Sequence, residues 1–219
     1  MNLARRIALV SGIALCVAAS VWAQMGRMGP QMPSMPGKFN PEVGTGAQYQ
    51  MQAKNMNMNF TYAVVGKESV DGGTGYWMEI RTTGGQMPGE MVTKQLMVID
   101  GDKVGIKKMI TQVAGRPPME MPGMMMSRVQ QGQAQAESGQ KPQVIGTETI
   151  TVPAGTFVCQ HMRSTSGKEP MDFWVSTNVR PYGVVKMTGQ DLSMVLEKVL
   201  TGETSHIKGT PQKMEMPHF

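Results

Sequence analysis

The segment from Val144 to Lys186 constrains the fold of this chain more than any other stretch. Its apolar and polar side chains alternate, and the alternation stops at three short segments that contain glycine or proline, Pro153–Gly155, Ser166–Lys168 and Arg180–Gly183. Period-two alternation indicates strands with one buried face, and such interruptions are typical of turns. The segment is therefore predicted to be a run of β-hairpins.

Similar patterns on both sides predict further strands. The full set of expected strands is 47–54, 56–62, 76–83, 94–99, 104–113, 144–152, 156–164, 171–176, 184–188 and 192–199, with a last piece near 206–208. Short links of the Asp-Gly and Gly-Gly type join several of them, and short links favour antiparallel neighbours. We expect a mainly β fold, a single curved antiparallel sheet or half-open β-barrel of about ten strands with little helix.

The chain is expected to hold one domain. Residues 46–208 would form the antiparallel β domain, with a Met/Gln-rich insert at 117–141 that has no strand pattern. Within the insert, Met124–Glu137 reads either as a short helix or as an inter-strand loop. Residues 24–45 and 209–219 are rich in Met and Pro and are expected to be flexible tails.

The first 23 residues are predicted to be a cleavable signal peptide. Arg5 and Arg6 precede an apolar stretch at Ile7–Ala19, which is shorter than the roughly 20 residues that span a membrane. Cleavage after Ala23 would leave no transmembrane segment and a periplasmic or secreted protein. It would lower the formal net charge from +5 to +3, without a basic block that would indicate nucleic-acid binding.

A weak internal repeat is visible. The sequence VVGKESV at residues 64–70 is similar to VIGTETI at residues 144–150. Either the sheet consists of two related halves, or similar hairpins share similar turn chemistry.

Several motifs together resemble a known group of exported proteins. The motifs are VPAGTFVCQHMR, DFWVS, RPYGVVKM and a final MVLEKVLTG strand, within residues 47–208. They resemble the LolA/LolB-like group, and within it the uncharacterised bacterial DUF3108- and DUF4412-type domains. The resemblance implies a half-open antiparallel barrel whose apolar concave face shelters an acyl chain. Known carriers of the group ferry lipoproteins between membranes, and no site residue of theirs matches this sequence closely enough to be transferred.

Four aromatic side chains are candidates for a ligand pocket. They are Trp77, Phe157, Phe173 and Trp174. Because Phe173 and Trp174 are neighbours on one strand, they point to opposite faces, so that one anchors the core and the other lines the concavity or lies at the surface.

Methionine is the most unusual feature of the composition, with 24 residues. Clustered thioethers suit Cu(I), so a copper site is an alternative to a protein without a cofactor. Alternatively, the methionines are adaptable apolar side chains that fill gaps in the packing or cover an apolar concavity. The candidate copper ligands are Met119, Met121, Met124, Met125 and Met126.

The sequence contains no recognisable catalytic motif. Cys159 and His161 lie on one face of a predicted strand, but residues two apart on a strand are roughly 6.5–7 Å apart, too far for a catalytic pair. Cys159 is therefore expected to be a buried small side chain.

Three functions are compatible with these observations. The first is an exported, non-enzymatic binding protein that holds a lipid or other apolar ligand on the concave face of a curved sheet. The second is a methionine-rich, Cu(I)-handling envelope protein. The third is a structural or assembly factor that docks a partner, such as an envelope protein, on its sheet edges.

Overall fold

The computed structural model describes residues 35, 37–101, 103–123, 125–127, 129–130, 142–165 and 169–213. The predicted signal peptide, most of the N-terminal tail, half of the insert and the last six residues lie outside this part. The described residues form twelve strands, rather than about ten. They are β1 (Thr45–Ala53), β2 (Met56–Val70), β3 (Gly73–Gly84), β4 (Met91–Asp100), β5 (Lys103–Val113), β6 (Met119–Glu120), β7 (Gln143–Val152), β8 (Gly155–Ser164), β9 (Met171–Val175), β10 (Val184–Thr188), β11 (Leu192–Thr201) and β12 (Gln212–Lys213).

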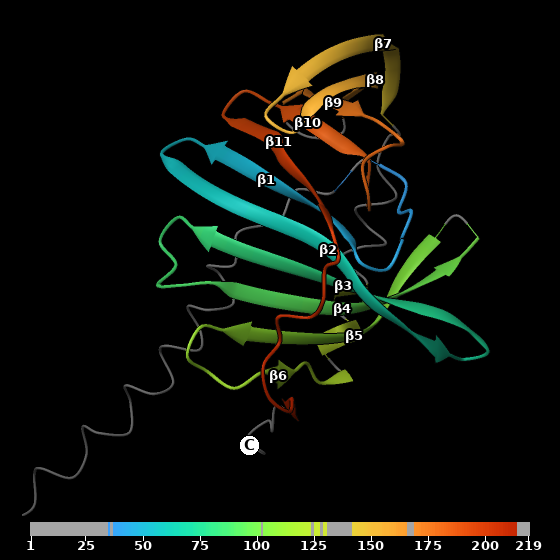
Figure 1. Cartoon of the computed structure of the whole chain (residues 1–219), viewed down its shortest axis with the longest axis vertical. Helices are drawn as coiled ribbons and strands as arrows, with labels where there is room; N and C mark the ends of the chain where they lie inside the picture. The colour runs from blue at the N-terminus through green and yellow to red at the C-terminus, as the bar shows by residue number, and fades with distance from the viewer. Residues whose placement is uncertain are drawn as a thin grey trace, which may run out of the picture. The chain divides into compact units, whose positions relative to one another are not determined.

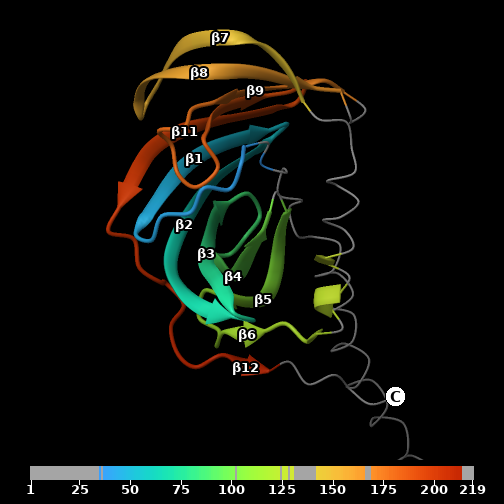
Figure 2. The same ribbon diagram turned by 90° about the vertical axis from the view of Figure 1, so that its right-hand side faces the viewer.

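All twelve strands belong to one open, curved sheet (Figures 1 and 2). Their order is β12-β6-β5-β4-β3-β2-β1-β11-β10-β9-β8-β7, so β1 joins two runs of hairpins by pairing with both β2 and β11. The mainly β, curved antiparallel architecture predicted from the alternation is confirmed. One pair departs from it, because β12 runs parallel to β6.

Two segments of the chain differ from the sequence-based expectation. The insert contains a strand, β6, and a short helix within residues 123–130, where Met126 packs against Ile106 and Met109. The expected strand near 206–208 is absent from the described chain. Instead residues 202–211 form an extended segment, hereafter the strap, which runs along the convex side of the sheet before β12 (Figure 2).

The strap is held by a buried carboxylate. Glu79 on β3 is 1% exposed and accepts hydrogen bonds from the Ser205 hydroxyl at 2.9 Å and from the His206 backbone N–H at 3.0 Å. Arg81, two residues further along β3, pairs with Glu203 at 2.6 Å. Glu79 and Arg81 therefore point to the convex face, which we call the outer face. The concave side is the inner face.

Cross-strand pairing extends the two faces from β3 to the edge strand β7. One row of paired residues crosses seven strands on the outer face: Thr83, Asn59, Gln50, Val195, Lys186, Trp174 and His161. A second row of paired residues, shifted by one position along each shared strand, lies on the inner face: Met58, Met51, Met194, Met187, Phe173, Met162 and Val144. The two rows lie back to back, because successive side chains of a strand point to opposite faces.

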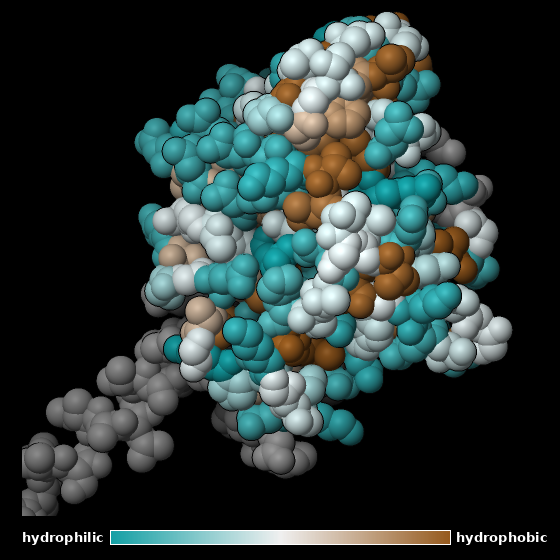
Figure 3. Space-filling model, viewed as in Figure 1, coloured by the Kyte–Doolittle hydropathy of each residue, from teal (hydrophilic) through white to brown (hydrophobic). Residues whose placement is uncertain are grey.

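Figure 3 shows the side of the molecule that the strap crosses. Most of the visible surface is polar, and apolar side chains form separate patches on it. The inner-face row contains five methionines and no charged side chain. The sheet is therefore amphipathic over much of its width.

The inner face of the first half is covered by an aromatic cluster. Phe39 is 6% exposed and packs on Tyr182, with ring centroids 5.3 Å apart, and Tyr182 meets Tyr62 edge to face at 6.1 Å. Gly37 lies so close to this loop that a Cβ atom there would be 1.5 Å from the Tyr182 carbonyl oxygen. The described end of the predicted flexible tail is therefore packed, because the Phe39 side chain finds an apolar site.

The internal repeat has a structural counterpart. β2 has a bulge between Val64 and Gly66, and β7 has one between Val144 and Gly146, at the corresponding position of the repeat. The pairing of β4 with β5 and that of β9 with β10 also shift register at matching places, at Leu96/Met97 and at Val184/Lys186. Bulges are not produced by turn chemistry alone. The matched bulges favour two related halves, β2–β5 and β7–β10.

The inner-face row is expected to carry much of the stability of the sheet. Met194 has no exposed surface, whereas Met56 at the start of β2 is 43% exposed. Met194→Ala removes buried thioether contacts and leaves a cavity, so it should lower the free energy of unfolding by about 2–5 kcal/mol. Met56→Ala should change it by less than about 0.5 kcal/mol. Urea unfolding measures both, and equal losses would contradict the assignment of the row to the core.

Candidate functional site

Burial along the inner-face row falls steeply toward one edge of the sheet. Met194 and Met187 are 0% exposed and Phe173 is 4% exposed. Met162 on β8 is partly exposed, and Val144 on the edge strand β7 is 58% exposed. Val158, on the same face of β8, is 65% exposed. The row thus begins as core and ends as open apolar surface on β7 and β8.

The matched halves show how unusual this exposure is. Val64 and its partner Met78 precede the bulge in the first half and are 0% and 2% exposed. Val144 and its partner Met162 hold the same positions in the second half and are both accessible. Similar side chains at equivalent places are therefore covered in one half and open in the other. We call Val144, Val158 and Met162 the open apolar end.

The polarity of β7 to β9 is divided strictly between the two faces. The acidic, basic and histidine side chains of these strands all lie on the outer face. They are Glu148, His161, Arg163 and Asp172. On the inner face the same strands present only uncharged side chains, which are valine, threonine, serine, glutamine, methionine and phenylalanine. Such a surface can contact hydrocarbon without burying a charge. Methionine adds adaptability, because its unbranched thioether repacks easily.

The four aromatic side chains predicted to line a ligand pocket do not come together. Phe173 lies on the inner face, where it pairs with Met162 and Met187. Trp174 and Phe157 lie on the outer face of the second half, and Trp77 lies on the outer face of the first half. Only Phe173 is adjacent to the open apolar end. Period-two alternation could separate Phe173 from Trp174, but it could not say which of them faced inward.

The two tryptophans are held by similar contacts. The Trp77 indole N–H donates to Glu68 at 2.9 Å, and the Lys94 ammonium lies 4.9 Å from the ring centroid. The Trp174 indole N–H donates to Glu148 at 2.8 Å, and Lys186 lies 5.0 Å from its ring. The Trp77 indole therefore links β3 to β2 and β4, and the Trp174 indole links β9 to β7 and β10. Both contacts stabilise the sheet on its outer face.

His161 is the centre of a polar network that joins the edge hairpin to β9. Its Nδ1 is 2.7 Å from Glu148 Oε1 on β7, and its Nε2 is 2.8 Å from Asp172 Oδ1 on β9. The imidazole also stacks on Trp174, with centroids 4.5 Å apart and an interplanar angle of 14°. Arg163 completes the network by donating to Asp172 at 2.9 Å.

The hydrogen bonds of the network change the pKa values of His161, Asp172 and Glu148. Burial alone would lower the pKa of His161, but the hydrogen bonds to Asp172 and Glu148 outweigh it and raise that pKa above its ordinary value. The Arg163 guanidinium, followed by His161, holds the pKa of Asp172 below its usual range. The Trp174 indole and then His161 do the same for the pKa of Glu148.

Cys159 does not form a reactive pair with His161. The thiol is 1% exposed, and burial, followed by the nearby Glu148 charge, raises its pKa. Both ring nitrogens of His161 are engaged by carboxylates, so neither is free to take a proton from the thiol. The expectation that Cys159 is a buried small side chain is confirmed.

The methionines of the insert lie in different environments. Met126 is 6% exposed in the cluster with Ile106 and Met109, and Met121 packs against the same cluster. Met119 is partly buried in β6 and Met125 is 40% exposed, while the position of Met124 falls outside the described residues. The packing of Met121 and Met126 fits the role of apolar filler, and copper binding by the set stays a prediction.

The described residues contain neither a candidate metal cluster nor a membrane-spanning helix. No group of three or more His, Cys, Asp and Glu side chains is arranged to hold a metal ion there. No helix in that part is long and apolar enough to cross a membrane.

Sequence reasoning missed the methionines of the strands. It drew attention to the methionine clusters of the loops, whereas the inner-face row is formed by Met51, Met58, Met162, Met187 and Met194. The available signal was that each of them occupies the apolar phase of a predicted strand. Their alignment across the sheet could not be found, because it depends on the register between strands that are distant in sequence.

The network around His161 generates a prediction about pH. A histidine with a raised pKa contributes stability that is complete below its ordinary pKa of about 6.5 and is lost as the pH rises through the folded-state pKa. The carboxylate of Asp172, with a lowered pKa, keeps its contribution until the pH falls well below about 4. His161→Gln should therefore lower the melting temperature more at about pH 5.5 than at about pH 8.5. Thermal unfolding of both proteins at the two pH values measures this, and a pH-independent difference would contradict it.

Comparisons with known proteins give only distant similarities. No family model matches the chain, and no curated protein matches it. A candidate lipoprotein from Parabacteroides distasonis is similar in structure, with a TM-score of 0.39 and 15% identity over 74% of this chain and 98% of its own. A candidate exported protein with a YmcC-like fold from Bacteroides fragilis has a TM-score of 0.38 and 13% identity over 74% of this chain and 99% of its own. Neither similarity assigns a function to the chain.

Proposed function

We propose that this protein is an exported, non-enzymatic binding protein that holds an acyl chain or a similar apolar ligand on its inner face. The ligand rests on the open apolar end and extends toward Phe173. One observation carries the proposal: the apolar row that forms the core of the sheet continues onto β7 and β8, where Val144 and Val158 are 58% and 65% exposed.

The dimensions of the row suit an extended hydrocarbon chain. Neighbouring strands lie about 4.8 Å apart, so the part of the row from Val144 to Phe173 spans roughly 10 Å. The whole row, from Val144 to Met58, crosses seven strands and spans roughly 29 Å. A short chain would bind at the open apolar end alone. A longer one would need the flexible side chains of Met187 and Met194 to repack around it.

The strict division of polarity supports an apolar ligand over a charged one. All the inward-facing side chains of β7–β9 are uncharged, so a hydrocarbon chain loses no hydration of an ion when it binds there. The network of Glu148, His161 and Asp172 lies on the opposite face and holds the edge hairpin in place. In this arrangement the outer face supplies rigidity and the inner face supplies the binding surface.

A neutral fluorescent monoacylglycerol with a long chain tests the proposal. The mature protein should quench or enhance its emission on binding. Val158→Lys places a charge in the open apolar end without disturbing the core, and it should weaken binding by about tenfold or more, because hydrocarbon contact would be replaced by a solvated ammonium. The neutral probe avoids attraction between the new lysine and a ligand carboxylate.

Val43→Lys is the matched control. Val43 is 45% exposed and lies before β1, away from β7 and β8. It should leave probe binding unchanged, and both variants should keep the melting temperature of the parent protein. Failure of the parent protein to bind the probe, or equal losses in the two variants, would contradict the proposed function.

A further inference from the structure

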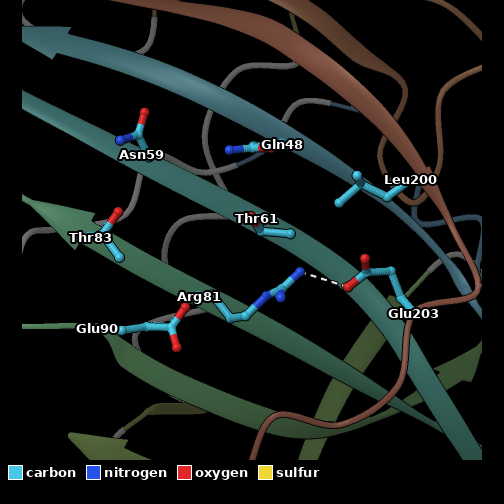
Figure 4. A pocket seen from close by; sticks show the side chains of 8 residues that line it. All are labelled: Gln48, Asn59, Thr61, Arg81, Thr83, Glu90, Leu200 and Glu203. Carbon is cyan, nitrogen blue, oxygen red and sulfur yellow. Dashed lines mark hydrogen bonds and ion pairs between the residues drawn. The ribbon is translucent and has the colours of Figure 1, made fainter. Parts of the chain in front are cut away.

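The outer face carries a second feature, which the proposed function does not use. A pocket of about 400 Å³ opens between the strands at the centre of the sheet and the start of the strap (Figure 4). Its lining residues come from β1, β2, β3, the end of β11 and adjoining segments: Gln48, Asn59, Thr61, Arg81, Thr83, Glu90, Leu200 and Glu203. Cross-strand pairing places Gln48, Thr61 and Arg81 side by side in one outer-face row.

The floor of the pocket is formed by uncharged polar side chains. Gln48, Asn59, Thr61 and Thr83 line it, and in the part of the chain that the structure describes none of the four side chains makes a hydrogen bond to another protein group. Two of them are amides and two are hydroxyls, so each offers both a donor and an acceptor. Paired strands rather than a loop set their backbone positions, which fixes the spacing between the four side chains.

The charges at the rim select against anions. Arg81 is occupied, because it pairs with Glu203 at 2.6 Å and contacts His206 Nε2 at 2.7 Å. The Arg81 and Glu203 side chains are each only 15% exposed. Glu90 is exposed at the opposite rim and has no ion pair within the described chain. Among the residues that line the pocket, an anionic ligand would therefore meet an unpaired carboxylate and no free cation.

We propose that this pocket binds a neutral saccharide of one or two sugar units. Sugar hydroxyls donate and accept hydrogen bonds, as the amide and hydroxyl side chains of the floor do. Adjacent strands present these groups about 4.8 Å apart, a spacing comparable to the width of one sugar ring. Leu200 adds one apolar contact at the wall, suited to the C–H face of such a ring. The site is on the face opposite to the apolar row, so the two ligands do not compete.

Calorimetric titration of the mature protein tests the proposal. The probes are neutral di- to tetrasaccharides of glucose, galactose, mannose and N-acetylglucosamine, with an oligogalacturonate as the anionic comparison. At least one neutral oligosaccharide should bind, and the anionic oligomer should bind more weakly than its neutral counterpart. The double variant Asn59→Ala, Thr83→Val removes two of the four free polar groups and should weaken binding by about tenfold, the effect of losing two ordinary hydrogen bonds.

Gln160→Ala is the matched control, because it removes an exposed amide from the inner face of β8, away from the pocket. It should bind the saccharide as the parent protein does. The inference is overturned if no neutral saccharide binds, if the double variant binds as tightly as the parent protein, or if the anionic oligomer is preferred. None of these results depends on the monoacylglycerol experiment. A negative result for one of the two proposed sites therefore leaves the test of the other unaffected.

Discussion

The structure depends on cross-strand register. A shift of one residue in any of the central strands would move its methionine from the inner row to the outer face and bring a polar or charged side chain inward. The antiparallel ladder between β2 and β9 keeps Met58, Met51, Met194, Met187 and Phe173 in one line. Bulges at matched places in the two halves bend the sheet while preserving the faces on which these residues lie.

Side-chain contacts on the outer face stabilise the open sheet, although no second sheet of the described chain packs against that face. In the first half the strap buries Glu79 and bonds to it, and Trp77 is held between Glu68 and Lys94. In the second half, where the strap does not reach, His161 joins three strands through two carboxylates. Both devices hold neighbouring strands together from outside. The inner face of β7 and β8 then remains available, which is the basis of the proposed binding function.

The alternation of side chains was sufficient to predict most strands. The segment Val184–Thr188 was expected as a strand with the bounds observed for β10. The expected break between strands 47–54 and 56–62 is likewise observed as the link between β1 and β2. These features are local, and the hydrophobic pattern of a few residues determines them.

The candidate site was harder to predict, because it depends on contacts between distant segments. No local signal indicates that β1 lies between β2 and β11, and without that order the methionine row cannot be assembled. The partners of His161 come from two other strands, and Glu148 and Asp172 appear as scattered acidic residues in the sequence. The packing of Phe39 and the parallel pairing of β12 with β6 also join segments far apart in the chain.

Photo-crosslinking tests the central claim most directly. A neutral acyl probe with a diazirine near the end of its chain would be bound to the protein without its first 23 residues and irradiated. The labelled residues would then be located by peptide mapping. We predict labelling of the inner-face positions of β7 and β8, with Val144, Val158 and Met162 as the principal sites. Labelling concentrated on outer-face residues such as Trp174, or spread evenly over the surface, would contradict it.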